Sequence, residues 1–159
     1  TQADPSPTAG DDAAMTRLLS QAAAAWEATG LSERQRSELP SVQVNFVDLP
    51  GLLLGAADRS VIYLDSNAAG YGWYAAATPE EDDEFTRTSA TSFRAPSTRS
   101  AAGRMDLLTV LTHELGHLLG LEDLDPVQAA DDIMAGVLQP GVRRLPWPAA
   151  VDAVFFGQG

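Results

Sequence analysis

The residues with the clearest chemical potential are two histidines, His113 and His117, in the stretch HELGHLLGLED that ends at Asp123. Residues four apart on a helix lie on the same face, so both imidazoles can bind a single Zn²⁺. Glu114 follows the first histidine and lies beside such a metal, where it can accept a proton from an activated water molecule. The stretch therefore predicts a hydrolytic zinc centre.

A third protein ligand must be a carboxylate or a weaker donor, because the chain has only two histidines and no cysteine. Gly120 allows the helix to end in a sharp turn, and that turn could bring Asp123 to the metal. A ligand from a later helix is the alternative, and since no glutamate follows Glu122, Asp152 is its candidate. A helix whose histidines are only hydrogen bonded is a further alternative, but it does not explain the spacing of Glu114, Gly120 and Asp123.

Hydrophobic periodicity predicts the elements that must position these residues. Leucines at helical spacing predict a buried helix over residues 105–119. Alternation of apolar and polar residues predicts a strand over residues 41–48, and short apolar runs predict two more. The predicted helices cover residues 13–29, 105–119 and 148–156, the predicted strands cover residues 41–48, 52–57 and 61–65, and residues 86–104 are predicted to form a long loop.

The motif H-E-x-x-H-x-x-G-x-x-D resembles that of the metzincin clan of zinc metalloendopeptidases. Most members have a histidine at the position of Asp123, and a minority, including the snapalysin-like enzymes, have aspartate. The segment Asp131–Gly136 resembles the Met-turn of the clan, which implies that Met134 lies beneath the zinc site. The order of the remaining elements is similar to that of the matrixin-like metzincins, and the resemblance covers residues 13–159.

The resemblance implies an α+β fold with a small, twisted, mostly parallel sheet that has an antiparallel edge strand. A backing helix, the zinc-binding active-site helix, the Met-turn and a C-terminal helix complete that fold. Residues 1–12 are expected to be a flexible linker before a metalloprotease domain over residues 13–159. Within that domain, an upper subdomain over residues 13–120 ends in the zinc helix, and residues 121–159 form the lower subdomain.

The implied function is zinc-dependent hydrolysis of peptide bonds, with His113, His117 and Asp123 as ligands and Glu114 as general base. Metzincins add an extended peptide to the edge strand above the zinc. By chain order that strand is residues 52–57, which gives the substrate-binding candidates Leu53, Leu54, Gly55 and Ala56. A plain core strand is the alternative for this segment. The alternative for the whole chain is a catalytically idle, metzincin-like binding module of a larger surface protein.

The composition of the chain limits the kinds of partner that the protein can bind. The net charge is −12 at pH 7, with ten arginines and no lysine, so the surface repels nucleic acid and anionic membranes. No apolar run is long enough to span a membrane. The protein is expected to be a monomer. The acidic run at residues 80–84 is either a solvated loop or part of a Ca²⁺ site. The chain begins at Thr1 without methionine, so we expect an excised domain or a mature form, and the resemblance implies an extracellular, bacterial location.

Overall fold

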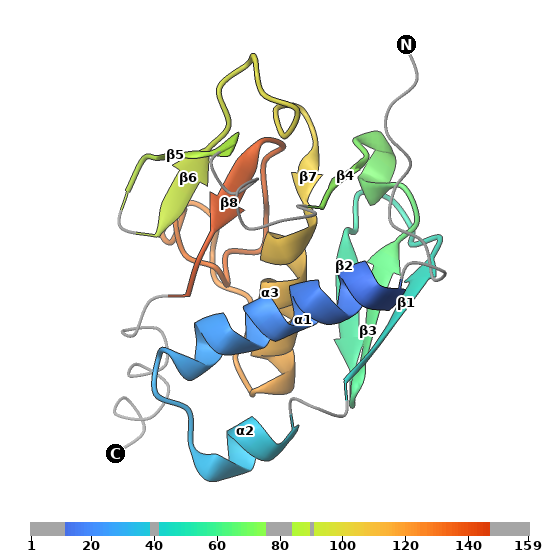
Figure 1. Ribbon diagram of the computed structural model, residues 1–159, viewed down its shortest axis with the longest axis vertical. Coiled ribbons are helices and arrows are strands. Elements are labelled where there is room, and N and C mark those ends of the chain that lie inside the picture. The colour runs from blue at the N-terminus through green and yellow to red at the C-terminus, as the bar shows by residue number, and fades with distance from the viewer. Residues whose placement is uncertain (1–11, 39–41, 76–83, 90, 147–159) are drawn as a thin grey trace.

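The computed structural model describes residues 12–38, 42–75, 84–89 and 91–146 as an α+β arrangement of helices and three small sheets (Figure 1). None of the described helices is both long and apolar enough to cross a membrane. The helices are α1 (Asp12–Glu27), α2 (Glu33–Glu38), the short 3₁₀ helix η2 (Ala68–Gly70) and α3 (Leu107–Leu118). The strands are β1 (Gln43–Val47), β2 (Gly55–Asp58), β3 (Val61–Asp65), β4 (Trp73–Tyr74), β5 (Thr86–Arg87), β6 (Ser92–Arg94), β7 (Met105–Asp106) and β8 (Val142–Arg144).

The first sheet has the strand order β1-β3-β2 and packs against α3. Strand β1 runs parallel to β3, and β2 runs antiparallel to β3 at the edge. The expected combination of a parallel pair and an antiparallel edge strand is therefore present. The edge strand is shorter than predicted, because it begins at Gly55 and residues 52–54 lead into it. Arg59, in the left-handed conformation with φ 59°, turns the chain from β2 into β3.

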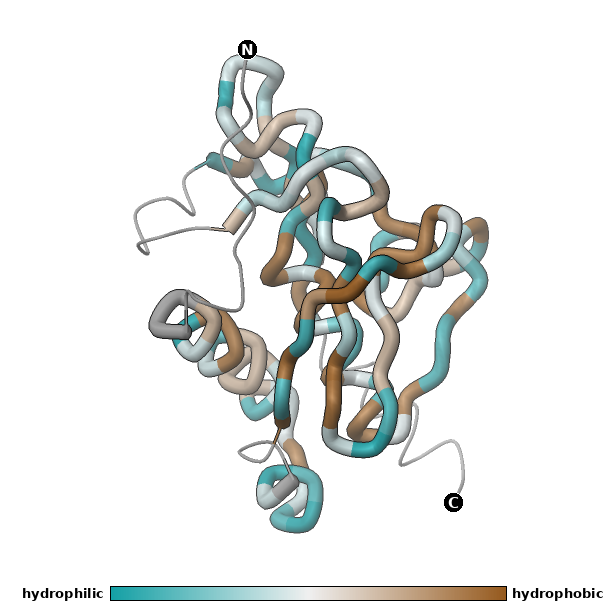
Figure 2. Tube along the Cα trace, turned by 90° about the vertical axis from the view of Figure 1, so that its right-hand side faces the viewer, coloured by the Kyte–Doolittle hydropathy of each residue, from teal (hydrophilic) through white to brown (hydrophobic). Residues whose placement is uncertain are grey.

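Helix α1 lies across α3, and Figure 1 shows it passing in front of that helix. Leu18, Ala22 and Trp26 are spaced four residues apart and fully buried, so they form the apolar face of α1. The indole Nε1 of Trp26 donates a hydrogen bond of 2.7 Å to the backbone oxygen of Thr112 in α3. Helix α2 is hydrophilic along its length (Figure 2), and its Gln35 donates to the carbonyl of Leu119.

The prediction of one sheet followed by a long loop was wrong. Strands β4 and β7 form a second, parallel sheet, and β5, β6 and β8 form a third, antiparallel sheet. Residues 86–104 therefore contain two strands, and their partner β8 follows much later in the chain. These strands are two or three residues long, so they are too short to show periodicity in the sequence.

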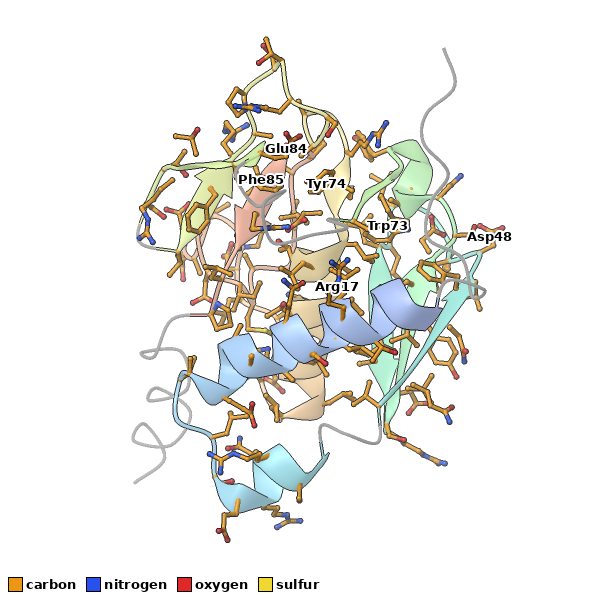
Figure 3. The ribbon with its side chains drawn as sticks, in the orientation of Figure 1. Arg17, Asp48, Trp73, Tyr74, Glu84 and Phe85 are labelled. Carbon is orange, nitrogen blue, oxygen red and sulfur yellow. The ribbon has the colours of Figure 1, made fainter. Side chains whose placement is uncertain are left out.

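A small second core lies beside the third sheet. Figure 3 labels Tyr74 and Phe85, whose rings meet edge to face at 5.7 Å between their centres, and Ala95 and Ala101 are buried with them. Arg143 from β8 stacks over Phe85, with its guanidinium carbon 4.5 Å from the ring centre. The third sheet is thereby attached to β4, which pairs with β7, the strand that leads into α3.

The predicted helix over residues 148–156 lies outside the described residues, and so does the alternative ligand Asp152. The predicted linker also lies outside them, except for its last residue, Asp12, which begins α1. The division into an upper and a lower subdomain stays a prediction.

Candidate metal centre

Helix α3 carries the two histidines, and its own burial fixes their direction. The leucines at positions 107, 108, 111 and 115 are buried, so His113 and His117 face the partly open side. Their rings lie 4.8 Å apart between centres and nearly perpendicular, at 87°. The spacing of four residues has therefore brought both imidazoles to one place, as the sequence predicted.

Backbone carbonyls determine which nitrogen of each ring is free. Nδ1 of His113 lies 2.8 Å from the oxygen of Ile133, and Nδ1 of His117 lies 2.9 Å from the oxygen of Leu121. A carbonyl oxygen only accepts, so each Nδ1 is the protonated donor. In the neutral ring, Nε2 then carries a lone pair, and burial of His113 lowers its pKa and favours that neutral form.

Asp123 reaches both free nitrogens. Its Oδ1 lies 2.9 Å from Nε2 of His113 and 3.0 Å from Nε2 of His117, although the side chain is 60% exposed. The turn that brings it there begins at Gly120, which has φ 101°. The N–H of Leu121 donates to the oxygen of Gly116, and this bond closes the helix end in the manner of a Schellman motif.

The donor set fits a divalent cation. Two lone pairs and a carboxylate oxygen repel one another at 3 Å unless a proton or a cation lies between them. Ligands bound tetrahedrally at about 2.0–2.1 Å lie about 3.3 Å apart, which is close to the separations of Asp123 from the histidines. Ligand atoms of His113, Glu114 and His117 also lie within 4.8 Å of one another, and these three residues form a possible metal-binding group.

Glu114 differs from Asp123 in burial and in hydrogen bonding. It is only 4% exposed, and its Oε2 has no hydrogen-bond partner among the described residues. Burial raises the pKa of Glu114 to about 7, with the charge of His117 opposing the rise and that of Asp123 adding to it. A buried carboxyl that titrates near neutral pH has the properties of a proton acceptor.

Glycines let two neighbouring segments approach α3 closely. A Cβ on Gly55 of β2 would lie 3.1 Å from Oε1 of Glu114, and a Cβ on Gly116 would lie 2.5 Å from the sulfur of Met134. Met134 is 2% exposed and packs against α3 at the residue before His117. The structure thus brings Met134 under the helix that carries the histidines, and its predicted contact with their rings stays a prediction.

A cleft of about 820 Å³ opens onto these residues. The substrate-binding candidates Leu53, Leu54, Gly55 and Ala56 all line it, together with His113, Glu114, His117 and Asp123. Several lining side chains are apolar and exposed, with Leu52 at 80% and Val137 at 50%. The cleft places the metal-binding group, a buried carboxyl and apolar surface in one space.

Sequence reasoning missed two arginines near this cleft. Arg143 forms a buried pair with Asp106 at the start of α3, with 2.8 Å from Nε to Oδ2 and 3.0 Å from Nη2 to Oδ1. Arg144 lines the cleft itself. The only signal in the sequence was an adjacent pair of arginines after the apolar Val142.

The proposed Ca²⁺ cluster lies mostly outside the described residues. Its last member, Glu84, labelled in Figure 3, accepts hydrogen bonds from the hydroxyl of Ser100 at 2.7 Å and from the N–H of Ala101 at 3.2 Å. The bond from Ser100 is the main cause that lowers the pKa of Glu84. One oxygen of Glu84 is therefore already used within the chain.

Comparisons with protein-family models, with curated proteins and with solved structures found no match to this chain.

Proposed function

We propose that this chain is a zinc-dependent endopeptidase. The observation that carries the proposal is the convergence of one carboxylate oxygen of Asp123 on Nε2 of both His113 and His117, at 2.9 and 3.0 Å. The hydrogen bonds of both Nδ1 atoms to backbone carbonyls also support a metal site, because they leave the two Nε2 lone pairs facing Asp123.

His113, His117 and Asp123 would hold the metal, in agreement with the resemblance to the metzincin clan. A bound Zn²⁺ supplies Lewis acidity, which polarises a peptide carbonyl and lowers the pKa of water. Glu114 accepts a proton at its buried carboxyl and later donates it to the leaving amine. In the metal-free protein, burial raises the pKa of Glu114 to about 7, so both of its protonation states are accessible near neutral pH.

The substrate would be an extended stretch of peptide. Strand β2 is at the edge of its sheet, and no described strand pairs with its outer side. Such an edge offers unpaired backbone groups to an incoming strand. The cleft beside it, with exposed leucines at positions 52 and 53, supports binding of apolar side chains of that peptide. An extracellular site of action is part of the proposal and has its support in the resemblance alone.

The test combines metal analysis with hydrolysis of an unstructured protein, with and without a chelator. We expect about one zinc per chain, hydrolysis that the chelator abolishes, and recovery when zinc is restored. Glu114→Gln should keep zinc and lose about 10²–10⁴-fold in rate. Glu122→Gln is the matched control, because it makes the same change at an exposed neighbour of Asp123 and should change neither property.

Three results would contradict the proposal. Full activity in Glu114→Gln would end the assigned mechanism, and loss of zinc in that variant would mean that Glu114 is a ligand. Bound zinc without hydrolysis of any peptide would favour the catalytically idle binding module.

A further inference from the structure

Arg144 is a buried cation at the wall of the cleft. It is the last residue of β8 and is 8% exposed, yet it lines the same space as the metal-binding group. Its backbone N–H donates to the hydroxyl of Thr109, one helical turn before His113 on α3. Its Nη1 donates 2.8 Å to the carbonyl of Val137, on the segment that follows Met134. The guanidinium is thus held between the zinc-binding helix and the segment after the predicted Met-turn.

Within the part of the chain that the structure describes, most of the hydrogen-bonding capacity of Arg144 is unused. A guanidinium has five N–H donors, and its side chain makes one hydrogen bond to the described residues. Its buried Nε has no partner among them, and no described carboxylate forms an ion pair with it. Burial lowers the pKa of Arg144, while the charges of Asp131 and Asp132 oppose this, and the group remains a cation.

Buried charges in proteins are usually paired, because an unpaired one has lost its hydration without compensation. Asp131 and Asp132 act on Arg144 only through space, and Oδ1 of Asp132 already accepts from the N–H of Met134. An unpaired, nearly buried donor beside a cleft is a position at which a ligand can supply the missing partner. A carboxylate is the ligand group that matches the planar fork of arginine.

We propose that Arg144 selects the substrate by binding the carboxylate of one glutamate or aspartate side chain of the peptide in the cleft. This inference rests on the proposed endopeptidase function and names its substrate class. The net charge of −12 repels a generally acidic peptide at long range. The preferred substrate therefore has a single acidic residue at the position that reaches Arg144 in the cleft, within an otherwise neutral or basic and partly apolar sequence.

The test uses peptides with amidated C-termini that carry glutamate or glutamine at each position in turn within a neutral sequence. Binding to the zinc-loaded Glu114→Gln protein is measured by fluorescence anisotropy, which does not require turnover. At one position, the glutamate peptide should bind about 10- to 100-fold more tightly than its glutamine partner, as expected for a charged hydrogen bond. A set with free C-terminal carboxylates and no glutamate tests capture of a chain end.

Variants in the same background assign the preference to the side chain. Arg144→Met should reduce the ratio of glutamate to glutamine affinity to about one, and Arg144→Lys should leave an intermediate ratio because it keeps the charge without the fork. Arg94→Met is the matched control, since it removes an exposed arginine of the same sheet outside the cleft and should leave the ratio unchanged. Circular dichroism and zinc content check that each variant is folded.

The outcomes separate the inference from the proposed function. Equal affinity for glutamate and glutamine peptides at every position overturns the inference, as does a preference that remains at its full size in Arg144→Met. Tighter binding of the free-carboxylate set alone overturns the assignment to a side chain. If the wild type hydrolyses peptides without a preference for an acidic residue, the role of Arg144 is rejected and the proposed peptidase activity stands. If acidic peptides bind preferentially but none is hydrolysed, the peptidase activity is rejected and the role of Arg144 in binding stands.

Discussion

Replacing Glu114 by glutamine should change the pH dependence of stability in the metal-free protein. The folded-state pKa of Glu114 is about 7, above the ordinary value of 4.5, because the side chain is buried. The folded protein therefore holds this proton more tightly than the unfolded chain. The stabilisation is complete below about pH 4.5 and is lost as the pH rises towards 7. Glutamine resembles the neutral carboxyl and cannot lose a proton, so the variant should not show this loss.

The size of the effect follows from the two pKa values. Each pH unit between 4.5 and about 7 corresponds to about 1.4 kcal/mol, so the full loss in the wild type is about 3 kcal/mol. Less than about 1 kcal/mol of this is lost by pH 5, and most of the remainder is lost by pH 8. For a chain of this size, about 1 kcal/mol shifts the melting temperature by about 2–4 °C. The variant should thus gain about 5–10 °C on the wild type between pH 5 and pH 8.

Thermal unfolding in the presence of a chelator, followed by circular dichroism at both pH values, measures this gain. Comparison at each pH removes the contribution of His113, whose lowered pKa acts in the opposite direction in both proteins. Glu122→Gln controls for the general effect of one charge and should show no such gain. If the difference between Glu114→Gln and the wild type is the same at pH 5 and pH 8, the argument from burial is wrong. Added zinc should weaken the dependence, since a nearby cation favours the carboxylate.

Three further predictions concern the ligands and the packing around them. Asp123→Ala should lower zinc affinity at least about 10-fold in a chelator competition, while Glu122→Ala leaves it unchanged. Gly55→Ala places a Cβ 3.1 Å from Oε1 of Glu114 and should lower kcat several-fold at full zinc content, as shown by kinetics with metal analysis. Met134→Leu should cost less than about 1.5 kcal/mol in denaturant unfolding, and Met134→Ser should cost more and release zinc.

Local sequence signals predicted the elements that are long enough to show a period. Helices α1 and α3 and strand β1 lie close to the expected ranges, because their apolar residues recur at 3.6 or at two residues, and β3 matches the short apolar run that predicted it. The second and third sheets were missed for a physical reason. Strands as short as β4 and β7 gain their stability from a partner distant in sequence, and a local pattern contains no information about that partner.

In the candidate site, too, the features set by local sequence could be predicted, and those set by distant residues could not. The common face of His113 and His117 follows from helix geometry, and the turn towards Asp123 follows from the conformational freedom of Gly120. The oxygen of Ile133 as the partner of His113 could not be predicted, since every residue has a backbone carbonyl. The pair of Asp106 and Arg143, which are 37 residues apart, likewise depends on the tertiary fold.

Helix α3 is held by residues that lie far from it in the sequence, so the candidate site can form only late in folding. Trp26 and Thr112 are hydrogen bonded across 86 residues, and the loop between them must close before the bond contributes anything. A nascent chain that ends just after Asp123 would already contain both histidines, but it would lack Ile133 and Met134. Since His113 then has no acceptor for Nδ1, its ring orientation is not fixed. The candidate site should therefore acquire its shape after the rest of the helix has formed, and a new chain should not offer a complete metal site until the segment with Ile133 has packed against α3.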